Sequence, residues 1–174
     1  MMRTHTMLFL ALFMLTLGLG QLSAQGRFQQ NPNADALFAD GTRLYRAGRY
    51  DDALAIFESL RKGEIVHQKT TAAYLMAAKS SFALHHYEAV APVLLEFIQR
   101  YPESDYLPDA YYTLGMASFV THRYVDAARQ LLHAMELASD EKLRSASATL
   151  RVASRCAMWK SKASLRRMSA ASPL

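Results

Sequence analysis

The strongest constraint on the fold is a short turn sequence that occurs three times at a fixed interval. The copies read RYDDA from residue 49, HYEAV from residue 86 and RYVDA from residue 123. Their tyrosines, Tyr50, Tyr87 and Tyr124, are each 37 residues from the next. A fixed period of this size indicates a stack of similar units, each of which buries its apolar side against its neighbours.

Each turn is flanked by the pattern of an amphipathic helix. Around the first turn the apolar and small residues at intervals of three and four are Leu37, Gly41, Leu44, Ala53, Phe57 and Leu60. Gly48 suits the left-handed position just past a helix end, and Asp51 and Asp52 suit the first turn of the following helix. The pattern therefore predicts two helices joined by a tight turn, with the tyrosines packed between the helices.

These units resemble the tetratricopeptide repeat (TPR), a helix-turn-helix unit of about 34 residues. Its small packing position corresponds to Gly41, Ala78 and Gly115. Its turn aromatic corresponds to Tyr50, Tyr87 and Tyr124, and the small position of its second helix corresponds to Ala53, Val90 and Ala127. The resemblance covers about residues 34–138 and implies an all-α, right-handed α-solenoid of three repeats, at about 34–67, 71–104 and 108–138. The segments 101–106 and 110–115 also resemble repeats of bacterial cell-envelope proteins of the outer-membrane assembly and cell-division type.

The N-terminus has the pattern of a secretory signal peptide. Arg3 precedes an apolar run from Met7 to Gly20, and the small residue Ala24 occupies a cleavage position. We expect residues 1–24 to be a signal peptide, residues 25–33 to be a polar leader, and the mature protein to be periplasmic or secreted. The apolar run is shorter than the roughly 20 residues that span a bilayer, which disfavours an uncleaved anchor. The residue directly after Ala24 is Gln25 and not a cysteine, so lipid attachment is not expected.

The TPR resemblance also implies a binding surface, because the first helix of each TPR unit lines the concave face of the stack. Three rows of residues follow the 37-residue step on these helices: Phe38, Leu75 and Tyr112; Tyr45, Phe82 and Phe119; and Thr42, Lys79 and Met116. Arg46 adds a positive charge beside these rows. Such a surface predicts a groove for an apolar or aromatic segment of a partner protein. Packing between helices remains the alternative for each aromatic residue, since aromatic side chains at helical spacing are commonly core residues.

Enzyme and metal-site motifs are missing from the sequence. It has one cysteine, Cys156, and no nucleophile elbow, phosphate loop or zinc-helix motif. His85 and His86 are adjacent in a turn and have no acidic or cysteine partner nearby that would complete a metal site. We therefore expect a protein that is not an enzyme, with no catalytic residue, no metal and no cofactor.

Positive charge is concentrated at the C-terminus. Residues 142–174 hold eight Lys or Arg and no Asp or Glu. The start Ser139-Asp140-Glu141 predicts a helix that caps the stack over residues 139–158, or the first helix of an incomplete fourth unit. The basic, serine-rich residues 159–174 carry little apolar surface to bury, which predicts a disordered tail.

The sequence thus favours an exported TPR-type scaffold that holds a partner protein in its concave groove, with cell-envelope assembly as the expected setting. One alternative is an adaptor that binds a membrane surface through residues 142–174. Another is the truncated N-terminal solenoid of a larger envelope protein. Nucleic acid is not an expected partner because of the export signal, and the oligomeric state stays open.

Overall fold

The structure is a computed structural model that describes residues 31–63 and 66–170, with the side chains of residues 164–170 outside the description. The predicted signal peptide at 1–24 and residues 25–30 of the predicted leader lie outside the described residues. Within the described part, none of the helices is long and apolar enough to cross a membrane.

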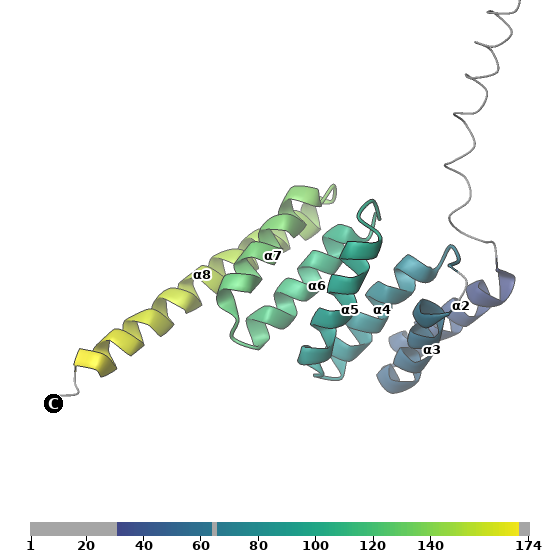
Figure 1. The fold of residues 1–174 in the computed structure, drawn as a ribbon, viewed down its shortest axis with the longest axis horizontal. Coiled ribbons are helices and arrows are strands. Elements are labelled where there is room, and N and C mark those ends of the chain that lie inside the picture. The colour runs from purple at the N-terminus through teal and green to yellow at the C-terminus, as the bar shows by residue number, and fades with distance from the viewer. Residues whose placement is uncertain (1–30, 64–65, 171–174) are drawn as a thin grey trace, which may run out of the picture.

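Seven helices make up the described chain. They are α2 (Pro32–Arg46), α3 (Tyr50–Lys62), α4 (Thr70–Ala83), α5 (Tyr87–Arg100), α6 (Leu107–Val120), α7 (Tyr124–Leu137) and α8 (Glu141–Ala170). Consecutive helices pack against each other as a stack of helix-turn-helix pairs that ends in α8 (Figure 1). Residues 31–63 and 66–170 contain no strand. The predicted all-α solenoid of three such units with a C-terminal capping helix is confirmed.

The three turns between paired helices share one backbone geometry. Gly48, His85 and His122 occupy the same left-handed position, with φ of 76°, 62° and 61°. The next amide in each turn donates to a carbonyl five residues earlier, in the pairs Arg49–Leu44, His86–Ser81 and Arg123–Ser118, over 3.0, 2.9 and 2.8 Å. This arrangement satisfies carbonyls that a helix end would otherwise leave unpaired. The repeated turn therefore stops each first helix and sets the direction of the second.

The turn tyrosines pack edge-on against an aromatic residue of the preceding helix. The ring centroids are 5.1 Å apart for Tyr45–Tyr50, 5.0 Å for Phe82–Tyr87 and 5.6 Å for Phe119–Tyr124. In the second and third units the tyrosine hydroxyl also forms a hydrogen bond with the left-handed histidine, His85–Tyr87 at 2.6 Å and His122–Tyr124 at 2.7 Å. These tyrosines hold the helix junctions, as predicted.

Glycines at the predicted small packing position let the paired helices approach closely. A Cβ atom added at Gly41 would lie 2.9 Å from Cε1 of Phe57, and one at Gly115 would lie 2.7 Å from Cγ of Leu131. Both distances are too short for real carbon contacts. Phe57 and Leu131 are fully buried and form part of the core that each pair encloses.

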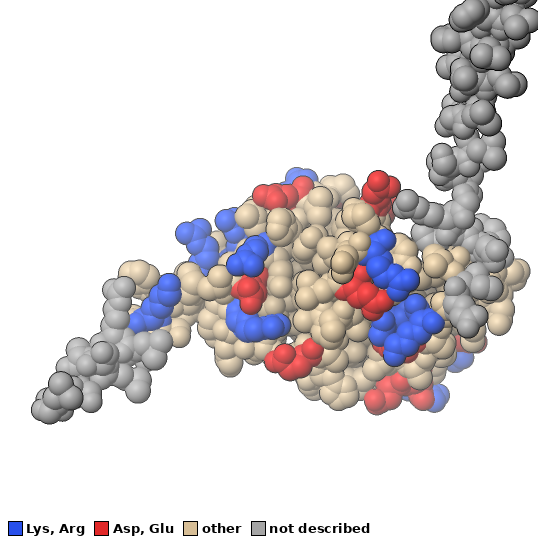
Figure 2. All heavy atoms as spheres, in the orientation of Figure 1, with Lys and Arg blue, Asp and Glu red and all other residues tan. Residues whose placement is uncertain are grey.

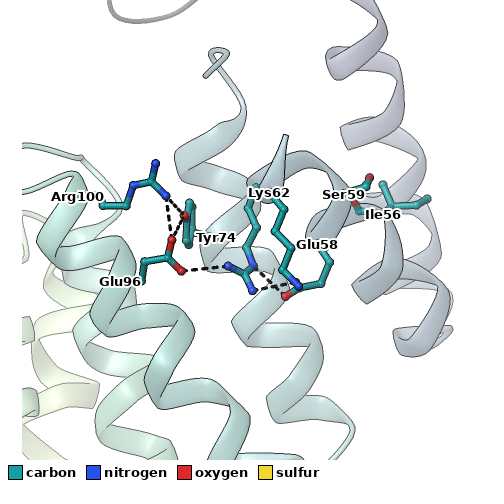
Figure 3. A network of polar contacts seen from close by, with 8 residues as sticks. Ile56, Glu58, Ser59, Lys62, Tyr74, Glu96 and Arg100 are labelled. Atoms are coloured by element: carbon teal, nitrogen blue, oxygen red, sulfur yellow. Dashed lines mark hydrogen bonds and ion pairs between the residues drawn. The ribbon is translucent and has the colours of Figure 1, made fainter. Parts of the chain in front are cut away.

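A polar network joins the first unit to the second (Figure 3). At its centre the hydroxyl of buried Tyr74 donates to Glu96 Oε1 at 2.6 Å. Arg61 on α3 reaches Glu96 at 3.3 Å, and Arg100 donates to both Glu96 and Tyr74 at 2.9 and 3.1 Å. Burial and the hydrogen bond to Glu96 raise the pKa of Tyr74, while the hydrogen bonds from Tyr74 and Arg100 lower the pKa of Glu96. The network thus holds a neutral phenol and an ionised carboxylate between α3, α4 and α5.

Two predicted boundaries are wrong. The predicted leader at 25–33 overlaps α2, which begins at Pro32, because Asn31 caps its first turn through hydrogen bonds to the amides of Asn33 and Ala34. A proline in the first turn starts a helix rather than breaking it. The predicted disordered tail at 159–174 is helical as far as Ala170. That segment has little apolar surface to bury. Its Ala, Lys, Arg, Leu and Met residues are nevertheless good helix formers, so they extend a helix that has already begun.

Candidate functional site

A groove lies across the first helices of the three units, α2, α4 and α6, and has a volume of about 500 Å³. Ten residues line it: Thr42, Tyr45, Arg46, Met76, Lys79, Phe82, Ala83, Tyr112, Thr113 and Met116. Seven of these were predicted from the sequence, namely Thr42, Tyr45, Arg46, Lys79, Phe82, Tyr112 and Met116. The structure therefore brings together most of the predicted set on one surface.

Helical geometry explains why these positions share a surface. Residues three and four apart lie on the same face of a helix, so Thr42, Tyr45 and Arg46 form one group on α2. The same offsets join Lys79 to Met76, Phe82 and Ala83 on α4. Sequence reasoning missed Met76, Ala83 and Thr113 because it followed only the 37-residue rows. Extending each row by three or four positions along its own helix would have found all three.

Three predicted residues do not line this groove. Leu75 is only 4% exposed and belongs to the core between α4, α5 and α6. Phe38 packs against Phe57 with a centroid separation of 5.5 Å, beneath the ammonium group of Lys69 at 5.7 Å. Phe119 packs edge-on against its turn tyrosine. These three side chains therefore pack against neighbouring helices, which was the alternative to a place in the groove.

The two basic side chains of the groove differ in whether they already have an acidic partner. Lys79 forms an ion pair with Asp109 at 2.9 Å, which links α4 to α6 across the groove. Exposed Arg46 has no hydrogen bond or ion pair from its side chain to any residue that the structure describes. Thr42 donates its hydroxyl to the Phe38 carbonyl at 2.8 Å, so its outward surface is largely its methyl group. Burial and the neighbouring Tyr50 raise the pKa of Tyr45, which keeps its hydroxyl neutral.

A second hollow continues this surface toward the C-terminal helix. It has a volume of about 330 Å³ and lies between the start of α6 and the start of α8. Tyr112 lines both hollows, so the two are adjacent. Asp105, Asp109 and Asp140 contribute acidic groups here and Lys142 contributes one basic group, so the lining has an excess of negative charge, opposite in sign to Arg46 at the other end. The concave surface therefore has apolar and aromatic walls, with a basic end at α2 and an acidic end at α8.

Within 31–63 and 66–170, no group of three or more His, Cys, Asp or Glu side chains is placed to hold a metal ion. His85 and His122 form hydrogen bonds with tyrosine hydroxyls.

No protein-family model and no curated protein sequence matches the chain. Solved structures do match its fold. PcrH from Pseudomonas aeruginosa superimposes with a TM-score of 0.65 at 19% identity, over 76% of this chain and 98% of that chain. PcrH in complex with the chaperone-binding region of PopD gives 0.65 at 18% identity, with the same coverage. The Yersinia enterocolitica type III secretion chaperone SycD, in complex with a peptide of the translocator YopD, gives 0.64 at 14% identity over 73% of this chain and 95% of that chain.

The fold is TPR-like. At these identities the likeness establishes the arrangement of the helices alone. The resemblance to envelope-assembly and cell-division repeats is not supported, since the matched structures are secretion chaperones.

The prediction of an exported, periplasmic or secreted protein is wrong by the same comparison, because the matched fold is that of a type III secretion chaperone, SycD, and not that of an exported envelope protein. The prediction depended on the apolar run Met7–Gly20. A run of about 10–14 apolar residues is typical of a buried core helix as well as of a signal peptide. Its length therefore could not decide between the two.

Proposed function

We propose that this chain is a non-enzymatic scaffold that binds a segment of a partner protein in the concave groove formed by α2, α4 and α6. The observation that carries the proposal is the groove itself, in which side chains from three successive units form one apolar and aromatic surface. Anchor side chains that enter such a surface supply most of the binding energy of a protein interface. The complexes of PcrH and SycD, whose partners are a chaperone-binding region and a translocator peptide, support the same use of this fold.

The chemistry of the groove indicates the kind of segment that it holds. Met76, Phe82 and Met116 offer flexible and aromatic contacts for apolar anchors. Arg46 at the α2 end is available for a carboxylate, while at the α8 end the acidic residues Asp105 and Asp140 outnumber the basic Lys142. The preferred segment therefore has apolar anchors, an acidic residue toward α2 and a basic residue toward α8. Lys79 contributes less to selectivity because Asp109 already neutralises it.

Peptide display tests the proposal without knowledge of the natural partner. The full chain is immobilised and a library of random peptides of about ten residues is selected against it, then the affinity of an enriched peptide is measured. We expect enriched peptides to carry apolar or aromatic anchors. Met116→Glu places a charge in the groove and should weaken binding at least about tenfold, because burying an unpaired carboxylate beside an apolar anchor is unfavourable.

Val125→Glu is the matched control. Val125 is 56% exposed on α7 and does not line the groove, so the same charge change should leave peptide affinity unaltered. Circular dichroism of both variants verifies the fold. Failure to enrich any peptide, or equal loss of affinity in Met116→Glu and Val125→Glu, would contradict binding in the groove.

A further inference from the structure

Helix α8 exposes a face that the equivalent helices bury. In α2 and α6 the small packing positions Gly41 and Gly115 lie against the helix that follows. The residue 37 positions after Gly115 is Val152, which is 62% exposed. No helix follows α8 in the described chain, so the face that carries Val152 has no covering helix there.

This outward face carries an apolar stripe. Val152, Cys156 and Trp159 are four and three residues apart, which places them on one side of the helix. Cys156 is exposed, and Trp159 is 69% exposed. On the opposite side, Ser147 and Ser154 are fully buried, where α8 packs on the stack. The stripe is therefore directed away from the rest of the molecule.

Basic side chains flank the stripe on both sides. At about 100° per residue, Arg155 and Lys162 lie to one side of the stripe and Lys160 lies to the other. All three are exposed. Basic side chains lie toward this end of the molecule in Figure 2, and residues 142–174 hold eight Lys or Arg with no Asp or Glu. In Figure 1 the yellow end of α8 extends beyond the other helices.

We propose that the outward face of α8 binds an anionic lipid surface. An exposed Trp beside an apolar stripe, with Lys and Arg at its borders, is the side-chain pattern of a helix that lies in the headgroup region of a membrane. The long Lys and Arg side chains reach phosphate groups while Val152 and Trp159 enter the apolar boundary. A second copy of the chain fits this face less well, because two such faces would bring basic residues together without acidic partners.

Trp159 is the only tryptophan in the sequence, so its fluorescence reports on this face specifically. The full chain is titrated with vesicles of phosphatidylcholine containing phosphatidylserine, and with vesicles of phosphatidylcholine alone. We expect the Trp159 emission to shift to shorter wavelength with the anionic vesicles only. Raising the salt to about 0.5 M should reverse the shift, since salt screens attraction between exposed charges and the surface.

Charge-reversal variants distinguish this helix from the rest of the chain. Arg155→Glu with Lys160→Glu should weaken the affinity for anionic vesicles at least about tenfold. Arg43→Glu with Arg49→Glu makes the same charge change at exposed positions of the first unit and should retain most of the affinity. No Trp159 shift, an equal shift with neutral vesicles, equal loss in both double variants, or a shift produced by an acidic polypeptide and not by vesicles would overturn the proposal.

Discussion

At the scale of single residues, the repeated turn depends on one left-handed position. Gly48 takes it without cost, whereas His85 and His122 take it with the support of a tyrosine hydroxyl. A Cβ atom at Gly48 would meet no neighbour within 4 Å. Any penalty for substitution at Gly48 therefore arises from the backbone conformation alone.

Gly48→Val should lower the free energy of unfolding by about 1–2 kcal/mol, because a β-branched residue is poorly accommodated at positive φ. Gly48→Asn should cost less, since Asn tolerates the left-handed region. Urea unfolding followed by circular dichroism measures both. Equal stability of the Val and Asn variants would show that the backbone conformation at Gly48 is not the determinant.

At the scale of helices, α8 is attached to the stack through small buried side chains. The hydroxyls of Ser147 and Ser154 donate to the carbonyls of Leu143 and Leu150 in the same helix, at 2.7 and 2.9 Å. Both serines are fully buried. Their contribution to docking is therefore close packing and not a hydrogen bond between helices.

Ser154→Leu should destabilise the docking of α8 by about 1–3 kcal/mol, because the larger side chain overpacks a fully buried site. Amide hydrogen exchange should accelerate in α8 more than in α4 and α5. Ser154→Ala serves as the control and should change little, since the Leu150 carbonyl keeps its helical hydrogen bond. A Leu variant with exchange rates like those of Ala would rule out tight packing at this site.

At the scale of the whole molecule, the stack transmits stability between neighbours. Most contacts between helices join helices that are consecutive in the chain. Fewer contacts join first helices of successive units, α4 to α6 and α6 to α8, along the concave side. The network of Tyr74, Glu96 and Arg61 links the first unit to the second (Figure 3). The middle unit therefore has neighbours on both sides, whereas the first unit has one.

Phe57 and Phe97 are both fully buried, so Phe→Ala should cost about 3–5 kcal/mol locally at either position. In Phe57→Ala we expect hydrogen exchange to accelerate mainly in α2 and α3. In Phe97→Ala the loss of protection should extend through α4 to α7, because the middle unit connects the others. Identical exchange patterns in the two variants would contradict a stack stabilised by nearest neighbours.

Much of the fold was predictable because the repeat period and helical spacing are local properties of the chain. Tyr50, Tyr87 and Tyr124 supplied the register, and from it seven groove residues followed. The register could not show that Leu75 is buried while Tyr112, at the equivalent position, lines the groove. That difference depends on which side chains of other helices pack against each position.

The sequence by itself determined the helix pairs, their turns and the surface formed by the first helices, since each depends on residues close together in the chain. Tertiary structure decided which charges of the groove are available to a partner. Asp109 on α6 neutralises Lys79 on α4, whereas Arg46 has no acidic partner among the described residues. Tertiary structure also decided which face of α8 is exposed. Only the arrangement of α8 on the stack shows that Val152 and Trp159 point outward, since exposure depends on which neighbouring helix is present.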